Sequence, residues 1–572
     1  MEKINKLKKI FKKNNIEGYI VPKNDEFFGE YIPENKDRLR YISNFSGSYG
    51  FALILSDKNY LFVDGRYSLQ AKIQSGNYLK IKTIPKQLPY NILKNKKIKI
   101  GYDPKLFTKK NLNLFFGKTK CIFKPINRNL IDDIWVRNTK NSNQKFYILP
   151  RQSVGQSHTQ KINQIVSNMI KKKADFYFIT AGENIAWLLN IRGKDTNYSP
   201  IPNGYILIDK KKNIKFFCDL KKVSYTLRKK LNVINFLDIK TTNLNLLKII
   251  DKKIIIDKNT CSIYFENILL KHNEVLDQED PIYLLKSVKS KNEISNIKRA
   301  HIYDGAALTK FLFWIKENYL NKKITEISAS DKLYNFRKKN KKFQFLSFPT
   351  ISGAGPNGAI IHYKATKKSN RQLKKGDVYL VDSGGQYNFG TTDVTRTISL
   401  QVNNKKIKNI FTRVLKGHIA VANFKLKKNT SGSDIDHVAR KFLKQVNLDY
   451  AHGTGHGVGY FLNVHEGPQA ISKNNRVNFK AGMVVSNEPG YYEKNKFGIR
   501  IENLIYVKKN GSKLCFDNLT MAPIDKDFID QSIMNKKEIL WLNNYHKGVY
   551  INLKKFMNKT EVSKLKQACS AI

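Results

Sequence analysis

The first half of the chain alternates short hydrophobic runs with polar segments that have helical spacing. Runs of strand length occur at residues 18–22, 51–55, 60–63 and 98–100. At the amino terminus, Ile4, Leu7 and Phe11 recur at the spacing of one helix face. Short strands separated by helices are typical of α/β domains. We therefore predict an α/β domain over residues 1–140.

The same order of segments recurs between residues 141 and 285. Three pairs of segments resemble each other: 19–25 and 177–183, 41–48 and 187–193, and 50–55 and 204–209. A repeat of this length predicts a second, related α/β domain over residues 141–285. Because the matches are short, two unrelated α/β domains remain the alternative. Neither copy has a glycine-rich phosphate loop or an acid–base cluster, so we interpret both as shaping or assembly domains.

From residue 286 the pattern changes. Residues 286–300 are polar with helical spacing, and residues 345–520 form short β-favouring runs broken by glycines, except for a helical interval at about 405–447. Helical spacing returns over about 525–572. Strands and helices grouped separately are typical of α+β folds. We predict an α+β domain over residues 286–572 that ends in a helical extension.

Length and cysteine use limit the class of protein. A chain of 572 residues is too long for a single core, which fits three domains. Its five cysteines are scattered and form no Cys-x-x-Cys pair, which favours reduced thiols in the cytoplasm over disulfides or a thiolate zinc site. No run approaches the ~18 apolar residues of a membrane span. The Lys-rich amino terminus lacks the apolar core of a secretory signal.

The formal net charge of +57 is the strongest compositional signal. Such a charge raises the question of nucleic-acid binding. The lysines, however, are spread along the whole chain beside many Asn, Ile and Phe residues, and no nucleic-acid-binding motif accompanies them. We interpret the charge as a composition bias and predict no specific nucleic-acid partner.

Two aspartates of the third domain lie where β-favouring runs end or begin. Residues 378–381 are apolar and lead into Asp382, and a second run begins around Asp393 after a glycine-containing segment. This arrangement predicts an antiparallel hairpin, which can bring both carboxylates to one face. Facing carboxylates repel each other unless a cation or a proton lies between them.

Three further segments carry imidazoles or carboxylates. His452 and His456 lie among glycines that disfavour the helix of zinc proteases, so we predict a strand or loop there. Glu488 ends a β-favouring run and precedes a Pro-Gly turn. Alternation places Arg500 and Glu502 on one face of another run, where the buried charge of Glu502 needs compensation.

Together these segments supply a set of five candidate ligands: Asp382, Asp393, Glu488, Glu502 and His456. Oxygen-rich ligation with one nitrogen favours Mn²⁺, Fe²⁺ or Co²⁺. Four carboxylates are too many for one divalent ion but suit two ions about 3.5–4 Å apart, which would activate a water between them. Singly, Asp382 could cap a turn and His456 could be a core histidine. Glu502 could form a structural ion pair with Arg500. The joint occurrence favours the metal site.

The motifs around these residues resemble those of the pita-bread metallopeptidases, specifically the long, three-domain Xaa-Pro aminopeptidases. The site motifs are VDSGGQYNFGTTDVTRT, HGTGHGVGYFLNVHEGP, SNEPGYY and GIRIEN. The motifs YISNFSGS, FVDGRYSLQA, NIAWLLNIRG, GPNGAIIHY and WLNNYH extend the similarity over nearly the whole chain. The resemblance implies two related amino-terminal α/β domains of the creatinase type, followed by an α+β pita-bread catalytic domain.

The resemblance also implies how the metals would be held. Asp382 would bind one ion, whereas Asp393 and Glu502 would bridge both ions. His456 and Glu488 would hold the second ion, and Glu488 would also serve as the general base.

On the substrate side, the resemblance implies four further positions. His465 would contact the scissile region and support proton transfer, and His362 would be a second histidine on the substrate. His452 would line the same pocket, and Arg500 would lie beside the bridging Glu502.

The implied reaction is hydrolysis of an N-terminal Xaa-Pro peptide bond by a hydroxide that bridges two metal ions, with Mn²⁺ expected. Proline lacks an amide hydrogen and fixes φ, so such peptides need a dedicated site. The resemblance also implies that the protein is a homodimer in the cytoplasm. One alternative is a prolidase, restricted to Xaa-Pro dipeptides, which the duplicated first half disfavours. The other is a catalytically silent pita-bread binding module, which the complete ligand set disfavours.

Overall fold

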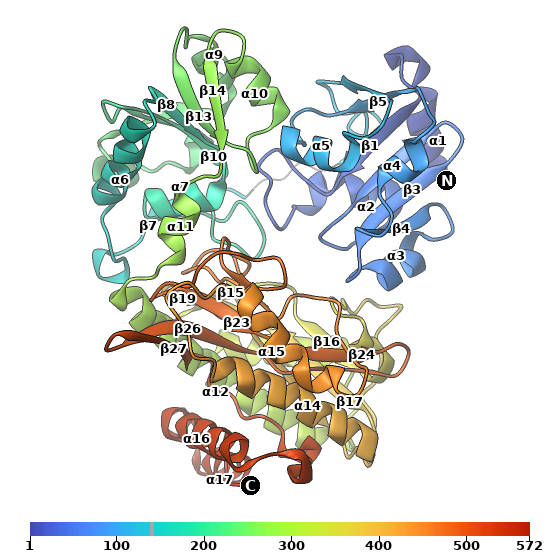
Figure 1. Cartoon of the computed structure of the whole chain (residues 1–572), viewed down its shortest axis with the longest axis vertical. Helices are drawn as coiled ribbons and strands as arrows, with labels where there is room; N and C mark the ends of the chain where they lie inside the picture. The colour runs from blue at the N-terminus through green and yellow to red at the C-terminus, as the bar shows by residue number, and fades with distance from the viewer. Residues whose placement is uncertain (138–141) are drawn as a thin grey trace. The chain divides into compact units, whose positions relative to one another are not determined.

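The computed structural model describes residues 1–137 and 142–572 (Figure 1). The chain divides into two compact units. Unit 1 comprises residues 1–151 and 156–283, and unit 2 comprises residues 152–155 and 284–572. The predicted boundary between residues 140 and 141 lies outside the described residues, and the predicted boundary at 285 stays a prediction. Among the described helices, none combines the length and hydropathy that crossing a bilayer requires.

The first part of unit 1 is a six-stranded sheet with strand order β4-β3-β2-β1-β5-β6. Its strands are β1 Gly18–Pro22, β2 Phe51–Leu55, β3 Asn59–Asp64, β4 Lys80–Ile84, β5 Lys99–Tyr102 and β6 Ile122–Pro125. The accompanying helices are α1 Glu2–Lys9, α2 Arg38–Ser43, α3 Ser68–Ser75, α4 Pro89–Leu93 and α5 Lys109–Phe116.

Strand β1 illustrates how this sheet is buried on both faces. Tyr19 and Val21 pack into one core together with Leu7 of α1. Ile20 packs into a second core together with Phe116 of α5. Because successive side chains of a strand point to opposite faces, a continuous apolar run forms a strand that needs cover on both sides.

The second part of unit 1 is another six-stranded sheet, with strand order β12-β11-β10-β8-β13-β14. Its strands are β8 Phe176–Ile179, β10 Gly204–Asp209, β11 Ile214–Cys218, β12 Ile234–Asp238, β13 Lys253–Asp257 and β14 Glu274–Gln278, and a separate ribbon pairs β7 Tyr147–Ile148 with β9 Ile191–Arg192. The helices are α6 His158–Lys171, α7 Gly182–Leu188, α8 Tyr225–Lys230, α9 Thr242–Leu247 and α10 Ile263–Leu269; α11 Ile282–Ser287 continues into unit 2.

The two sheets have the same topology. In each, the first strand pairs antiparallel with the second, as β1 does with β2 and β8 with β10. The first strand also pairs parallel with the fifth, as β1 does with β5 and β8 with β13. The remaining pairs agree in direction too. The prediction of two related α/β domains is confirmed.

Unit 2 contains small antiparallel sheets and long helices. Its strands are β15 Phe343–Leu346, β16 Ile351–Ala354, β17 Val378–Ser383, β18 Gly385–Tyr387, β19 Gly390–Thr391, β20 Val394–Ser399, β21 Gly455–His456, β22 Ala470–Ile471, β23 Val484–Asn487, β24 Gly490–Glu493, β25 Phe497–Arg500, β26 Asn503–Asn510 and β27 Lys513–Asn518. Its helices are α12 Lys291–Asn318, α13 Glu326–Lys338, α14 Lys405–Ala422, α15 Ser433–Lys444, α16 Lys536–Leu553 and α17 Lys559–Ala568.

The central sheet of unit 2 has the order β16-β17-β20, with both pairs antiparallel. The predicted pairing of the two aspartate-bearing runs is therefore present, but their connection is not a simple loop. It contains β18 and β19, which form a separate sheet with β15. Residues of α12 and α13 pack against β17 and β20 in one core.

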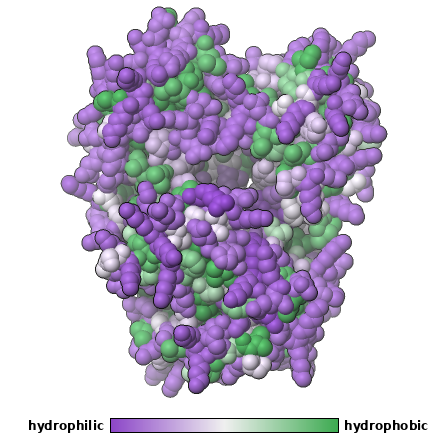
Figure 2. Space-filling view, in the orientation of Figure 1, coloured by the Kyte–Doolittle hydropathy of each residue, from purple (hydrophilic) through white to green (hydrophobic). Residues whose placement is uncertain are grey.

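On the face shown in Figure 2, hydrophilic residues cover most of the surface, and hydrophobic residues form scattered patches between them. This distribution matches the spread of lysines along the sequence.

Candidate metal centre

The five predicted ligands lie at or beside the ends of strands in unit 2. Asp382 is the fifth residue of β17 and Asp393 immediately precedes β20. His456 ends β21, and Glu488 follows β23 by one residue. Glu502 lies in the two-residue connection between β25 and β26. Strands far apart in the sequence thus supply all five side chains.

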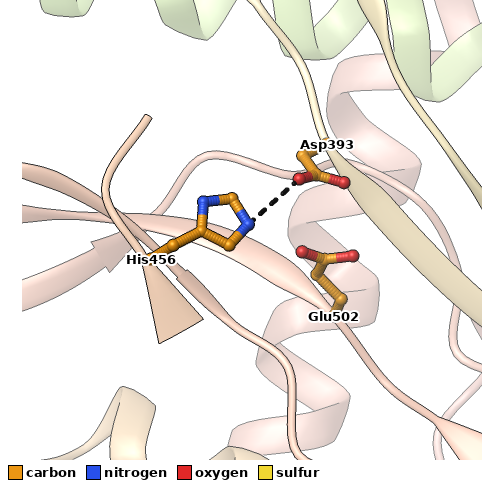
Figure 3. A group of neighbouring side chains, drawn as sticks. All are labelled: Asp393, His456 and Glu502. Atoms are coloured by element: carbon orange, nitrogen blue, oxygen red, sulfur yellow. Dashed lines mark ion pairs between the residues drawn. The ribbon is translucent and has the colours of Figure 1, made fainter. Parts of the chain in front are cut away.

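Three of these side chains form a cluster with metal-ligand spacing. Asp393, His456 and Glu502 each offer one atom such that all three atoms lie within 4.8 Å of one another. Figure 3 shows the imidazole and the two carboxylates directed toward a common point. The Nε2 atom of His456 is 3.4 Å from Asp393 Oδ2 and 3.5 Å from Glu488 Oε1, which brings Glu488 to the same ring.

The hydroxyl of Thr395 connects the fifth predicted ligand, Asp382, with Glu502. Thr395 lies opposite Asp382 in the pairing of β17 with β20. Its Oγ1 donates to Glu502 Oε2 at 2.8 Å and accepts from Arg500 Nε at 3.0 Å. Arg500 Nη2 in turn donates to Asp382 Oδ2 at 2.6 Å. Asp382 and Glu502 are therefore held around one threonine.

Ser486 performs a similar role for two other predicted ligands, His456 and Glu488. Its Oγ accepts from the backbone N–H of His456 at 2.9 Å and donates to Glu488 Oε1 at 3.1 Å. The approach of β21 to Ser486 requires glycine: a Cβ on Gly455 would lie 1.9 Å from the Ser486 carbonyl oxygen. The glycines of this motif thus allow the strand that bears His456 to pack closely against β23.

Asp382, Asp393 and Glu502 are buried, and the carboxylates of the centre repel one another. Burial raises the pKa of Asp382 to about 7, with Asp393 and Glu488 adding to the effect and Arg500 opposing it. Burial also raises the pKa of Glu502 well above its usual range, and the charge of Asp393 adds to that shift. Both shifts mean that the apo centre lacks enough positive charge to keep its acids ionised.

His456 shows the reverse effect. Burial alone would lower its pKa, but the interaction with Asp393 and the charge of Glu488 outweigh burial and raise the pKa to about 9. In addition, the Oδ1 atom of Asp382 is buried and has no hydrogen-bond partner among the described residues. The predicted ligands are mostly oxygen atoms, they carry excess negative charge, and one buried oxygen has no partner. These properties suit the binding of divalent cations.

Two of the three predicted substrate-side histidines lie beside the cluster. The rings of His465 and His456 have centroids 4.3 Å apart. His452 Nε2 is 2.9 Å from the hydroxyl of Tyr492, and its Nδ1 is 4.0 Å from Glu488 Oε2. His362 is half-buried in the turn that follows the 3₁₀ helix Gly355–Ala359, a helix that contacts β17 and β25.

The surroundings of Arg500 differ from the expectation. The sequence placed Arg500 and Glu502 on one continuous strand, but β25 ends at Arg500 and β26 begins at Asn503, in a different sheet. The reason is a change of backbone partner, since the N–H of Glu502 donates to the Thr395 carbonyl at 3.2 Å. The guanidinium pairs with Asp382 instead of Glu502.

Sequence reasoning missed three polar residues: Thr395, Ser486 and Tyr492. The Tyr492 hydroxyl accepts from Arg500 Nη1 at 2.6 Å and so joins that arginine to His452. A signal for Thr395 existed, because it lies two residues after Asp393 on the same strand face. No sequence signal distinguished Ser486 and Tyr492 from the other polar residues of their strands.

Comparison with known proteins identifies the family. The metallopeptidase family M24 model matches residues 295–509, and the creatinase/prolidase N-terminal domain models match residues 3–125 and 137–293. A model of the C-terminal region of peptidase M24 matches residues 512–572. Xaa-Pro aminopeptidase 1 of Dictyostelium discoideum is 37% identical, over 98% of this chain and 94% of its own length. The chain belongs to metallopeptidase family M24.

Further M24 relatives extend the similarity. A probable Xaa-Pro aminopeptidase P of Laccaria bicolor is 38% identical over 95% of this chain and 89% of its own length. The crystal structure of X-prolyl aminopeptidase from Caenorhabditis elegans, described as a cytosolic enzyme with a di-nuclear active site, superposes with a TM-score of 0.94 at 30% identity. It covers 100% of this chain and 99% of its own.

A shorter M24 structure matches only part of the chain. The prolidase from Pyrococcus furiosus superposes with a TM-score of 0.52 at 25% identity, covering 62% of this chain and 98% of its own. The predictions of the family, the fold class and a metal-dependent aminopeptidase are confirmed. The roles of individual site residues stay predictions.

Proposed function

We propose that this M24 enzyme removes the first residue from peptides whose second residue is proline. The observation that carries the proposal is the convergence of Asp393, His456 and Glu502 in a chain that matches Xaa-Pro aminopeptidases over nearly its whole length. A prolidase is the second candidate. It is disfavoured because the prolidase structure corresponds to 62% of this chain and leaves the remainder without a counterpart.

The cofactor in this proposal is a pair of divalent cations, with Mn²⁺ the first choice. Asp382 would hold one, His456 and Glu488 the other, and Asp393 and Glu502 would be shared. Oxygen ligands with one imidazole suit Mn²⁺, and Fe²⁺ or Co²⁺ are the competing choices. When bound, two such ions lower the pKa of a nearby water and stabilise negative charge on a carbonyl oxygen.

Glu488 is the proposed general base. Its backbone N–H donates to the Thr454 carbonyl at 2.8 Å, and its Oε1 accepts from Ser486. These two bonds fix the carboxylate beside His456. In this position Glu488 would take a proton from the attacking water and pass it to the departing proline nitrogen.

His465, His362 and His452 are the proposed substrate contacts. The ring of His465 lies beside His456, so a peptide whose carbonyl approaches the cluster would come within its reach. There His465 would donate a hydrogen bond as the carbonyl carbon becomes tetrahedral. Arg500 would act indirectly, by holding Asp382 and, through the Tyr492 hydroxyl, the ring of His452.

A substrate series tests the proposal. Full-length protein stripped of metal and reloaded with Mn²⁺ is assayed with Arg-Pro-Pro-Gly, Arg-Ala-Pro-Gly and the dipeptide Arg-Pro. We expect metal-dependent release of arginine from Arg-Pro-Pro-Gly, with much slower release from the alanine peptide. Cleavage of the dipeptide alone would favour prolidase, and no release at all would favour a silent module. Parallel loading with Fe²⁺ or Co²⁺ tests the metal.

Location and assembly belong to the same proposal. We expect a cytoplasmic homodimer without a specific nucleic-acid partner. The five cysteines are free, which suits a reducing compartment. Sedimentation equilibrium tests the dimer, and a gel-shift assay at physiological salt tests for nucleic-acid binding. A monomer, or salt-resistant complexes with RNA, would contradict these expectations.

A further inference from the structure

Unit 1 contains a basic and aromatic cavity of about 400 Å³. One side is formed by the loop after β1, the segment leading into α2, and Lys105 after β5. The other side is formed by Tyr205 of β10 and by residues of α9 and α10. This volume lies within the range of small-molecule sites, roughly 300–1,000 Å³, and exceeds what a single bare ion would fill.

Hydrogen bonds tie the two sides of this cavity together. The hydroxyl of Tyr205 donates to the carbonyl of Glu26 at 3.0 Å. The N–H of Ile263, which lies between the lining residues Ser262 and Tyr264, donates to the Phe107 carbonyl at 2.8 Å. The cavity is therefore a formed feature of unit 1.

The charge around the cavity is unbalanced. Its lining includes five cationic side chains: Lys36, Arg38, Lys105, Arg137 and Lys240. Glu26 is the lining carboxylate, 3.0 Å from Lys36 and 2.8 Å from Arg38. Asp132 neutralises Arg38 and Arg137 from outside the lining. In the part of the chain that the structure describes, no carboxylate lies within ion-pair distance of Lys105 or Lys240.

Arg38 adds a second, independent observation. It is only 3% exposed, and its Nε and Nη2 atoms are engaged by Asp132 and Glu26. Its Nη1 atom is buried and has no hydrogen-bond partner among the described residues. A buried donor on a charged group is costly when left unpaired, and Arg38 lines the cavity, so an anion there would be attracted to its guanidinium.

The aromatic residues supply an apolar surface beside these cations. Phe27 and Tyr205 stack with ring centroids 5.5 Å apart. Lys105 Nζ lies 5.0 Å from the ring centroid of Tyr264, whose hydroxyl accepts from Asn243 Nδ2 at 2.6 Å. The cavity thus combines cationic groups, ring surfaces and neutral polar groups.

We propose that this cavity binds a small phosphate ester, with the phosphate near Arg38 and Lys105 and the organic body against Phe27 and Tyr264. A phosphate monoester carries about −1.5 to −2 charge at neutral pH, which matches the surplus of cations better than a single carboxylate would. The site is independent of the metal centre and of the proposed peptidase reaction.

Calorimetric titration of the metal-loaded full-length protein with phenyl phosphate tests the proposal. We expect one site with Kd on the order of 0.1 mM or tighter at low salt, weakening as salt is added because the contacts are ionic. Benzoate and inorganic phosphate should bind at least about tenfold more weakly, since one lacks the second charge and the other lacks the ring. Equal binding of either probe would overturn the assignment.

Paired variants locate the site. The double substitution Lys105→Glu and Lys240→Glu reverses the two uncompensated cations without removing an ion pair, and should weaken phenyl phosphate binding at least about tenfold. The matched control is Lys172→Glu with Lys230→Glu, two exposed lysines of unit 1 outside the cavity, which should bind as wild type. Unchanged binding in the cavity variant would overturn the proposal.

The metal centre needs its own control, because phosphates also bind metal ions. Glu502→Gln should lose peptidase activity and keep the phenyl phosphate site. Loss of binding in Glu502→Gln, with retention in the Lys105/Lys240 variant, would assign the ligand to the metal centre and overturn the inference. An inactive wild-type enzyme that still binds phenyl phosphate would count against the peptidase proposal alone.

Discussion

Glu502 and Glu466 are both buried in unit 2, at 1% and 3% exposed, yet their pKa values shift in opposite directions. Around Glu502, burial raises the pKa and neighbouring carboxylates add to the effect. Around Glu466, burial would raise the pKa as well, but Lys286 and Lys289 outweigh it and lower the pKa. Their Nζ atoms lie 3.3 Å and 2.5 Å from the Glu466 carboxylate.

The opposite pKa shifts show which buried carboxylates are neutralised by cationic side chains of the same chain. Glu466 receives two lysines from the segment that precedes α12, so its cluster is complete without a ligand. The centre around Glu502 has four carboxylates. Among the described residues it obtains one permanent positive charge, from Arg500, and imidazoles that are charged only when protonated. Buried carboxylates left in excess require cations from solution. Substitutions at the two clusters, and the pH dependence of stability, test this contrast.

Replacing a carboxylate of the metal centre should abolish activity and leave the fold intact. For Asp393→Asn we expect kcat/KM to fall by about 10³-fold or more, equivalent to ~4 kcal/mol of transition-state stabilisation, with bound metal reduced in elemental analysis. The apo protein should unfold no earlier than wild type, because the substitution relieves repulsion. Asp331→Asn, at an exposed carboxylate of α13, is the control and should remain fully active.

Replacing Glu466 should instead damage stability. Glu466→Gln leaves Lys286 and Lys289 buried without a counter-charge, and the free energy of unfolding should fall by roughly 3–5 kcal/mol, measured by denaturant titration. Lys289→Met should cost clearly less, because Lys286 and Glu466 still balance each other. Equal losses in the two variants would contradict the charge argument and indicate a packing effect.

The apo protein should lose stability as pH rises from about 4 to 7. The pKa of Asp382 is about 7 in the folded state and near 4 when unfolded, so the folded state binds more protons in between. Unfolding free energy should therefore decrease with rising pH by on the order of 2–4 kcal/mol. Saturating Mn²⁺ should remove this decline, and Asp382→Asn should flatten it without metal. A metal-independent profile would contradict the charge imbalance.

The smallest effect is expected at Tyr492. Tyr492→Phe removes the hydroxyl that joins Arg500 to His452, so kcat/KM should fall about 3- to 30-fold, near 1–2 kcal/mol, with metal content unchanged. Tyr491→Phe is the matched control, since neighbouring side chains of β24 point to opposite faces. A loss of bound metal in Tyr492→Phe would show that the hydroxyl supports ligand geometry instead.

The sequence allowed the fold class and the candidate ligands to be predicted because both depend on local patterns. Apolar runs such as residues 18–22 identify buried strands, and Asp382 and Glu488 stand out because each ends such a run. The partner of Arg500 could not be predicted. Alternation assigned it to Glu502, whereas the change of sheet after Arg500 directs the guanidinium to Asp382, which is 118 residues away in the chain.

The cavity of unit 1 could not be predicted for a related reason. Its cations come from segments separated by as many as 204 residues, from Lys36 to Lys240, and each is one lysine or arginine among 103. In a chain so rich in lysine, no local pattern marks Lys105 or Lys240. The structure shows that most of the surrounding charges are paired, whereas these two lysines have no carboxylate partner among the described residues.

The two-residue connection between β25 and β26 has a consequence for how this enzyme can vary in length. Ile501 and Glu502 must cross from one sheet to another while keeping alternate orientations. One inserted or deleted residue would turn the carboxylate of Glu502 toward the hydrophobic side and an isoleucine toward the predicted metal centre. Surface loops tolerate changes in length, but this two-residue connection does not. Engineering by insertion should therefore avoid it.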